Sequence, residues 1–350
     1  MVRRLRIAVV GAGHVGCHLG GRLSQVADVS LIGRPRVIDP IRRDGLTLTG
    51  GGRPPLHVAP AQVTATTEGS AVGGADLVLL TTKTTATGAA VREVAPHLPT
   101  DAVIVTFQNG LRNGTLINDA LLEVFPSAAS RPLVLEGMIP YNVAQTAATT
   151  FHQASAGVLV VRDHPRADPF LQAARDSGLA IQPRADMDGI IAAKLLLNLN
   201  NAVHALSGLS LIEELRDRDL RRVSALCIEE ALAVFHRAGI RPSWLTGLPP
   251  KSIPSLLRSP TPVFASLARQ VLQVDVHATT SMADDFARGV PTEIGELQGR
   301  IVDLGRAHGV PTPVCARIVD LVRSVEASPP PHERWSGARL LTAVSARMSA

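Results

Sequence analysis

IAVVGAGHVG, residues Ile7–Gly16, decides the fold of this chain. A short apolar, β-rich run ends at Gly11, and a helical pattern that continues to Leu23 follows the G-x-G-x-x-G spacing. In such a strand–turn–helix unit Gly11 permits the tight turn, Gly13 lets the backbone approach a pyrophosphate, and Gly16 lets the helix pack on the sheet. Because the helix N-terminus faces the anion, the loop predicts a dinucleotide site made by Gly11, Ala12, Gly13, His14, Val15 and Gly16.

Strands and helices continue to alternate after this loop. Apolar runs at Val29–Ile32, Leu77–Leu80 and Val103–Thr106 alternate with helical segments such as Thr87–Ala95. This rhythm predicts a parallel sheet with helices on both faces. Pro132–Val161 contains β-rich pieces and no obvious crossover helix, so we expect it to add antiparallel strands that finish the sheet.

Helical periodicity dominates after about Ala185. The predicted helices are Ile190–Leu206, Leu220–Ala238, Pro262–Thr280, Glu293–His308 and a short one at Gly337–Arg347. We therefore predict two domains, a Rossmann-type α/β domain over residues 1–185 and an all-α domain over residues 186–350.

Composition excludes several function classes. Hydrophobic residues make up 45% of the chain and aromatic residues only 3%, which argues against a surface that stacks nucleic-acid bases. The arginines behind the net charge of +5 are scattered, so we expect no nucleic-acid partner. No stretch reaches the ~18 apolar residues of a membrane span, so we expect no membrane partner. Cys17, Cys227 and Cys315 are odd in number and far apart, which favours a cytoplasmic location over a disulfide framework.

The end of the second predicted strand bears on the choice of cofactor. It reads Leu31-Ile32-Gly33-Arg34, and an NAD site would usually place Asp or Glu near Gly33 to hold the ribose 2′-hydroxyl. A glycine followed by Arg34 suits a 2′-phosphate instead, which favours NADP(H). Arg34 is the candidate ligand; Arg36 could share the role, and either could simply be a surface arginine.

Only three of the 35 basic residues are lysines, namely Lys83, Lys194 and Lys251. A guanidinium stays protonated near neutral pH, whereas an ammonium can have its pKa lowered and donate a proton. Two interpretations follow: the lysines mark places where arginine does not suffice, or a base-composition bias left three of them at random. Lys251 stands beside prolines and is predicted to lie in a surface loop.

Lys194, Asn198 and Asn201 share one face of a predicted helix that is apolar on nearly every other side. A buried polar stripe on such a helix must find partners or a ligand. The alternative is an asparagine pair that serves contacts between helices, with Lys194 reaching toward solvent.

Three further motifs place polar side chains near predicted strand or helix ends: QNG at 108–110, SM at 281–282 and TEI at 292–294. Taken alone, Asn109 indicates a turn, Ser281 a surface serine, and Glu293 a carboxylate in the first turn of a helix. In order and spacing, these motifs together with the glycine loop, Lys83 and the Lys194-Leu195-x-x-Asn198 pattern resemble ketopantoate reductase (2-dehydropantoate 2-reductase) over essentially the whole chain.

The resemblance implies a Rossmann domain followed by a helical domain of the 6-phosphogluconate dehydrogenase type. It also implies roles for single residues. Lys194 matches the proton donor to the substrate carbonyl, and Glu293 matches its acidic partner. Asn198 and Ser281 match substrate contacts, while Lys83 and Asn109 match residues on the nicotinamide side of the cofactor site, with Asn109 also a candidate substrate contact.

The chain departs from the family pattern at several positions. The second helix asparagine of the family falls on Ala202, so Asn201 is the candidate, one residue away. Gly295 and Gln298-Gly299 stand where the family often has Asp and then Asn-Gly. These departures concern the acyl side chain of the substrate rather than the pair formed by Lys194 and Glu293.

The sequence thus favours an NADPH-dependent reductase that converts 2-dehydropantoate to pantoate for pantothenate synthesis, with Lys194 as general acid. The alternatives are a reductase of another branched 2-oxo acid and, from a different class, a non-catalytic NADP(H)-binding sensor. In each reductase the partner is a small 2-oxo acid, and the pattern predicts no metal. A monomer and a homodimer are both compatible with the sequence.

Overall fold

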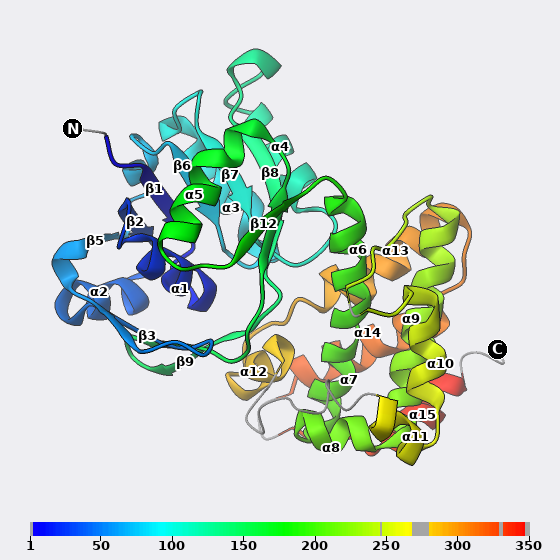
Figure 1. The fold of residues 1–350 in the computed structure, drawn as a ribbon. Coiled ribbons are helices and arrows are strands. Elements are labelled where there is room, and N and C mark those ends of the chain that lie inside the picture. Colours follow the sequence, from blue (N-terminus) through cyan, green and yellow to red (C-terminus); the bar gives the residue numbers. More distant parts are fainter. Residues whose placement is uncertain (1–2, 246, 268–279, 329–331, 347–350) are drawn as a thin grey trace. The chain divides into compact units, whose positions relative to one another are not determined.

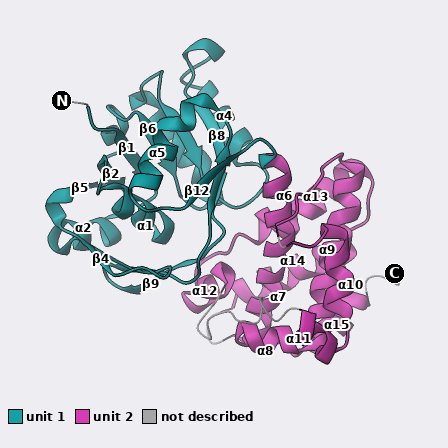
Figure 2. Ribbon diagram, viewed as in Figure 1, with its two compact units in different colours: residues 1–187 teal, residues 188–350 magenta. Residues whose placement is uncertain are grey.

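The computed structural model describes residues 3–245, 247–267, 280–328 and 332–346 (Figure 1). The chain divides into two compact units, Met1–Met187 (unit 1) and Asp188–Ala350 (unit 2), which are coloured separately in Figure 2. The fold class predicted from the sequence is confirmed, since unit 1 is an α/β sheet domain and the described part of unit 2 is helical.

Unit 1 is built on an eight-stranded sheet. Every neighbouring pair in it is parallel except β8–β11. Across the sheet the strands are β12 (Ile181–Arg184), β11 (Leu159–Arg162), β8 (Leu133–Met138), β7 (Val103–Thr106), β6 (Leu77–Leu80), β1 (Arg6–Val10), β2 (Asp28–Ile32) and β5 (Val63–Thr66).

Helices cover both faces of this sheet because both faces are apolar. Along β1, Ile7 and Val9 join one buried cluster, whereas Ala8 and Val10 join another. The first cluster includes side chains of α1 (His14–Leu23), α2 (Pro35–Asp44) and α5 (Asp168–Asp176). The second includes side chains of α3 (Thr87–Val94) and α4 (Asn113–Leu122). Burial on both faces is what a parallel sheet of this kind requires.

A second, four-stranded sheet lies against α1. Its order is β4 (Leu56–Val58), β3 (Leu46–Gly50), β10 (Thr150–Gln153) and β9 (Val143–Ala147). The expectation for Pro132–Val161 was therefore wrong in part. Only β11 adds an antiparallel strand to the main sheet, β8 is parallel and follows the crossover helix α4, and β9 and β10 leave the main sheet altogether.

The helices of unit 2 surround the long helix α9, which contacts most of the others. They are α6 (Met187–Asn198), α7 (Asn200–Ser207), α8 (Leu211–Arg216), α9 (Arg218–Arg237), α10 (Ile253–Arg258), α11 (Thr261–Leu267), α12 (Ser281–Ala287), α13 (Gln298–His308), α14 (Pro313–Glu326) and α15 (Gly337–Ser345). Of the helix predicted at Pro262–Thr280, residues 268–279 lie outside the described residues.

Two predicted helices differ from those observed. The single helix expected at Ile190–Leu206 is divided into α6 and α7 at Leu199. The helix expected from Glu293 begins only at Gln298, after a short 3-10 turn, η9 (Ile294–Glu296). Both differences arise beside residues of the candidate site.

Candidate active site

The glycine loop between β1 and α1 is closely packed at its two outer glycines. Gly11 has a φ of 101°, and a Cβ added there would lie 2.6 Å from the main-chain nitrogen of Thr82. A Cβ on Gly16 would lie 2.3 Å from the carbonyl oxygen of Gly11 and 3.1 Å from Val9 Cγ1. Larger side chains are therefore excluded at both positions, by the turn and by the approach of the helix to the sheet.

Gly13 differs from the other two glycines. A Cβ added there would find only the Gly11 carbonyl oxygen, at 4.0 Å, within contact range. Gly13 is also the N-cap of α1 and carries no capping side chain. The open space beside the N-terminus of α1 fits the pyrophosphate of a dinucleotide. His14 contributes its main chain at most, since its Nδ1 lies 3.2 Å from the carbonyl oxygen of Val143.

Hydrogen bonds connect the glycine loop to the end of β2, and Arg34 follows that strand. The amides of Gly11 and Ala12 donate to the Ile32 carbonyl at 3.0 and 2.9 Å. A Cβ on Gly33 would lie 2.7 Å from Ala12 Cβ, so the two loops are in contact. Arg34 is the N-cap of α2, its carbonyl oxygen accepts from the amide of Val37 at 2.9 Å, and its side chain is exposed. The guanidinium is thus available beside the glycine loop.

Lys83 and Asn109 follow β6 and β7, and their two loops are joined by hydrogen bonds. Thr84 Oγ1 donates to the Asn109 carbonyl at 2.8 Å, and Asn113 Nδ2 donates to the same oxygen at 2.7 Å. Gln108 Nε2 donates to the Thr82 carbonyl at 2.8 Å. Gln108 and Thr84 were not predicted as site residues. The QNG motif contained the signal for Gln108, but its partner lies 26 positions away in sequence.

These loops extend from neighbouring parallel strands in the order β2, β1, β6 and β7. The chain moves from β1 to β2 on one side and then returns to β6 on the other, so the glycine loop lies where the strand order reverses. Open α/β sheets bind ligands outside the carboxyl ends of strands at such a switch point. Unit 1 therefore brings the candidate cofactor residues to one edge of its sheet.

In unit 2, Lys194 and Asn198 are one turn apart on α6. The Asn198 side chain is buried, and Lys194 is half-buried among apolar neighbours that include Ala193 and Leu195. Burial lowers the pKa of the Lys194 ammonium from its ordinary value. A lysine in this condition can release a proton more readily than one on the surface.

A buried side-chain bond accompanies the break between α6 and α7. Gln298 Nε2 donates to the Leu199 carbonyl at 2.7 Å, and both residues are fully buried. Leu199 is the N-cap of α7, so this bond lies at the junction of the two helices. Asn201 therefore lies on α7 rather than on one continuous helix with Lys194 and Asn198.

Buried hydrogen bonds connect the segments that carry Ser281 and Glu293 to α7 and to the junction between α6 and α7. His204 Nδ1, on α7, lies 3.0 Å from Thr280 Oγ1, and Thr280 is the N-cap of α12, in which Ser281 is the first residue. Ser281 is exposed, and Glu293 is half-buried at the start of η9. The Glu293 carbonyl accepts from the amide of Glu296 at 2.9 Å. Glu293 thus precedes α13 and is not in its first turn, contrary to the expectation from the sequence.

Separate segments of unit 2 carry the candidate side chains: the Lys194 ammonium with a lowered pKa, the Glu293 carboxylate, the asparagine amides of α6 and α7, and the Ser281 hydroxyl. Among the residues that the structure describes, no group of three or more His, Cys, Asp or Glu side chains is placed to hold a metal ion. No helix in that part of the chain is long and apolar enough to cross a membrane.

Comparison with known proteins gives the family. The model of the ketopantoate reductase PanE/ApbA family matches residues 7–166, and its C-terminal model matches residues 186–326. A 2-dehydropantoate 2-reductase of Mesorhizobium japonicum is 26% identical over 339 residues, covering 91% of this chain and 97% of that protein. A 2-dehydropantoate 2-reductase of Halobacterium salinarum is 26% identical over 327 residues, covering 91% and 98% respectively.

Solved structures agree with this result. The crystal structure of a PanE/ApbA family ketopantoate reductase from Ralstonia eutropha is 27% identical, with a TM-score of 0.78 over 92% of this chain and 99% of that one. A ternary structure of D-mandelate dehydrogenase has the same fold, with a TM-score of 0.73 at 19% identity. Because the two family models together match most of its length, the chain belongs to the ketopantoate reductase family.

Proposed function

We propose that this protein catalyses the NADPH-dependent reduction of 2-dehydropantoate to pantoate, a step toward pantothenate. The observation that carries the proposal is Lys194, an ammonium on an apolar helix whose pKa is lowered by burial, one turn from Asn198. The segments that carry Ser281 and Glu293 are tied to the same pair of helices. A protein that only senses the cofactor has no need of a proton donor in this setting.

The chemistry follows from the charge that develops on the substrate. The nicotinamide, when bound, supplies a hydride to the carbonyl carbon. Negative charge then develops on the carbonyl oxygen, where the Lys194 ammonium stabilises it and donates a proton from Nζ. The ketone becomes a hydroxyl group, and the neutral amine recovers its proton from solvent. In this proposal Glu293 helps to orient the ketone and the ammonium.

The substrate carboxylate requires hydrogen-bond donors rather than a nucleophile. Asn198, Asn201 and Ser281 supply amide and hydroxyl donors, and Asn109 is the corresponding candidate in unit 1. We assign the cofactor to the carboxyl-end loops of unit 1, with Lys83 and Asn109 on the nicotinamide side. Arg34 and the absence of an acidic residue at Gly33 favour NADPH over NADH.

The runner-up is a reductase of another bulky or branched 2-oxo acid. It is motivated by Ala202 and Gly295, which differ from the family pattern on the substrate side. D-mandelate dehydrogenase, whose structure was solved with NADH and anilino(oxo)acetate, shows that the fold also occurs in an enzyme of different specificity.

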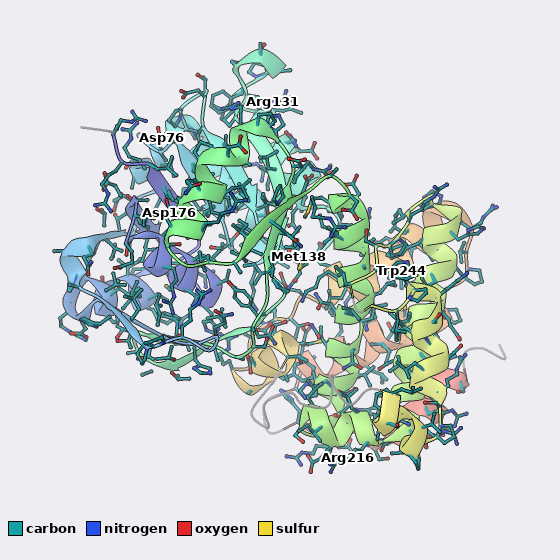
Figure 3. All side chains as sticks on the ribbon, viewed as in Figure 1. Asp76, Arg131, Met138, Asp176, Arg216 and Trp244 are labelled. Carbon is teal, nitrogen blue, oxygen red and sulfur yellow. The ribbon has the colours of Figure 1, made fainter. Side chains whose placement is uncertain are left out.

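For the setting of the protein, we propose the cytoplasm, in keeping with three buried free cysteines. A monomer and a homodimer remain the two candidate states. A dimeric ketopantoate reductase from Staphylococcus aureus has the same fold, with a TM-score of 0.66 at 18% identity. Trp244, between α9 and α10, is 66% exposed (Figure 3).

The deciding experiment is turnover of a panel of 2-oxo acids with NADPH and NADH side by side. The proposal expects the highest kcat/KM for 2-dehydropantoate with NADPH. A higher value for another branched 2-oxo acid would select the runner-up. Cofactor binding without oxidation of NADPH by any member of the panel would favour a sensor.

A further inference from the structure

Unit 1 holds a group of basic and polar side chains between α1 and the four-stranded sheet, which we call the α1 cluster. His18 and Arg22 come from α1, Tyr141 from the segment between β8 and β9, Arg53 from the turn between β3 and β4, and Gln153 from β10. The rings of His18 and Tyr141 are 5.9 Å apart and nearly perpendicular. His18, Arg22 and Tyr141 are 0%, 7% and 6% exposed, so these three are interior residues.

Two polar atoms of the α1 cluster are buried without a partner. Among the described residues, Arg22 Nε and the Tyr141 hydroxyl make no hydrogen bond, whereas a hydrogen bond with the Gln153 side chain raises the pKa of His18. Buried polar groups in folded proteins are nearly always paired, and two exceptions in one place call for a water or an ion. The Arg22 charge acts on Tyr141, so one bound species can serve both atoms.

The charges in the α1 cluster favour an anion over water. The pKa of His18 is lowered to about 4, mainly by burial and further by the nearby charges of Arg22 and Arg53. Within the described parts of the chain, neither arginine forms an ion pair with a carboxylate. Arg22 lies in the last turn of α1, where the helix dipole favours a positive charge. The dipole does not supply a hydrogen-bond partner for Arg22 Nε or for the Tyr141 hydroxyl. A water molecule would pair these atoms without balancing two positive charges.

The α1 cluster has an opening to solvent at Arg53. This side chain is half-buried on a turn whose Gly51 and Gly52 have φ values of 63° and 70°. A Cβ on Gly52 would meet nothing within 4 Å, and one on Gly178 would lie 3.7 Å from Arg53 Nη1. Arg53 is therefore the member of the α1 cluster that solvent reaches, whereas Arg22 is an interior residue.

We propose that the α1 cluster binds a small dianionic oxyanion of the phosphate class, held by Arg22, Arg53 and the Tyr141 hydroxyl. Two guanidinium groups match the charge and the planar hydrogen-bonding edges of such an ion. The site is separate from the glycine loop. Arg22 stands in the last turn of α1, eight residues beyond His14, or about 12 Å along the helix axis.

Titration of the whole protein with inorganic phosphate tests this proposal. Calorimetry and the unfolding temperature are measured against potassium chloride of equal ionic strength, and sn-glycerol 3-phosphate serves as a second arm that distinguishes a phosphomonoester from the free ion. We expect one site per chain and an unfolding temperature about 5 °C higher at a hundredfold excess over Kd. The proposal would be overturned if potassium chloride raised the unfolding temperature as much as phosphate does. It would also be overturned if neither inorganic phosphate nor sn-glycerol 3-phosphate gave a saturable heat of binding.

Variants locate the ion. Arg53→Gln, at a half-exposed position, and Arg22→Gln should each weaken phosphate binding by at least about tenfold. Arg34→Gln, in the other candidate anion site of unit 1, should leave phosphate binding unchanged. Unchanged binding in Arg53→Gln, or its loss in Arg34→Gln, would contradict the assignment.

The same variants distinguish a ligand site from a merely structural arginine. Without phosphate, Arg53→Gln should unfold at the same temperature as the parent protein or higher, because it removes a like charge from beside Arg22. It should become the less stable of the two only when phosphate is added. An Arg53→Gln protein that is less stable by the same margin with and without phosphate would show that Arg53 serves the fold alone.

Discussion

Gln298 Nε2 donates a 2.7 Å hydrogen bond to the carbonyl oxygen of Leu199, and neither residue is exposed to solvent. The bond joins the helix that carries Lys194 to the segment that follows Glu293. It thereby links the two residues proposed to act on the carbonyl group, although neither of them takes part in it. Gln298 is thus a positioning residue rather than a catalytic one.

Replacing Gln298 by leucine should remove the buried side-chain donor of the Leu199 carbonyl. We expect the free energy of unfolding to fall by about 1–3 kcal/mol and kcat to fall with it. Urea denaturation and steady-state kinetics measure the two effects. Gln182→Leu, at an exposed position of β12, is the matched control. Gln298→Asn, which shortens the side chain, should be intermediate; a Gln298→Leu protein as stable and active as the parent would rule out the role.

Lys194→Ala should lower kcat by roughly 10²- to 10⁴-fold, the usual contribution of a general acid, while cofactor binding is retained. Lys194→Arg keeps the charge but cannot release a proton near neutral pH, so it should also be slow. Fluorescence titration with NADPH and stopped-flow turnover separate the two properties. An unchanged kcat in Lys194→Ala would remove Lys194 from the mechanism.

The lowered pKa of Lys194 also predicts the alkaline limb of the pH profile. A general acid must be protonated to act, so kcat should decrease as pH rises through the pKa of the bound ammonium. Because burial lowers this pKa, the decrease should begin below the ordinary lysine value of 10.5. The measurement is kcat from neutral to alkaline pH at saturating substrate. A limb that lies at or above the ordinary value would mean that Lys194 is not the group that titrates.

Arg34→Gln should discriminate between the two nicotinamide cofactors. Loss of a charge-assisted bond to the 2′-phosphate should raise KM for NADPH by roughly tenfold or more and leave KM for NADH nearly unchanged. Arg36→Gln, on the same helix, is the comparison variant, since Arg36 is also exposed. Equal effects of Arg34→Gln on the two cofactors would argue against a 2′-phosphate ligand at this position.

Glu214 predicts a pH dependence of stability in unit 2. Burial raises the pKa of its carboxyl group to about 8, and Asp217 adds to the increase. Asn200 Nδ2 donates to Glu214 Oε2 at 3.2 Å, and Asn200 Oδ1 accepts from Ser224 Oγ at 2.8 Å. Between about pH 4.5 and 8 the folded protein keeps the Glu214 proton, whereas the unfolded chain has lost it. Stability contributed by Glu214 is therefore full below about pH 4.5 and decreases as pH rises toward 8.

Glu214→Gln should remove that dependence. The free energy of unfolding of the parent protein, relative to the variant, should fall between pH 5 and 8 by on the order of 3 kcal/mol. Urea denaturation at several pH values measures this difference. Asp303→Asn, at an exposed position of α13, should follow the parent protein. Parallel curves for the parent and Glu214→Gln would show that Glu214 is ionised in the folded state.

What the sequence could predict was local. The strand, turn and helix around Gly11, Gly13 and Gly16 follow from neighbouring residues, and the strand–helix rhythm is enough to define the parallel sheet. The break at Leu199 could not be predicted, because the residue that contacts it there, Gln298, is far along the chain. Helical periodicity alone extends the helix through such a position.

The four-stranded sheet was missed for a related reason. Its strands are short, and they pair between segments distant in sequence, so local patterning contains no sign of the partner. The α1 cluster was missed as well. His18 and Arg22 follow the glycine motif in what looks like an ordinary amphipathic helix, and their neighbours Arg53 and Tyr141 come from loops.

The parallel pairing of β3 with β10, in which Thr47 is opposite Thr150, has a consequence for biosynthesis. The hairpin of β3 and β4 leaves the ribosome long before its partner, so one face of α1 stays uncovered while most of unit 1 is being made. The nascent chain can close this face only after residue 153 has emerged. Truncated chains that end before β9 should therefore associate with chaperones or aggregate, even though they contain the complete glycine loop and six strands of the main sheet.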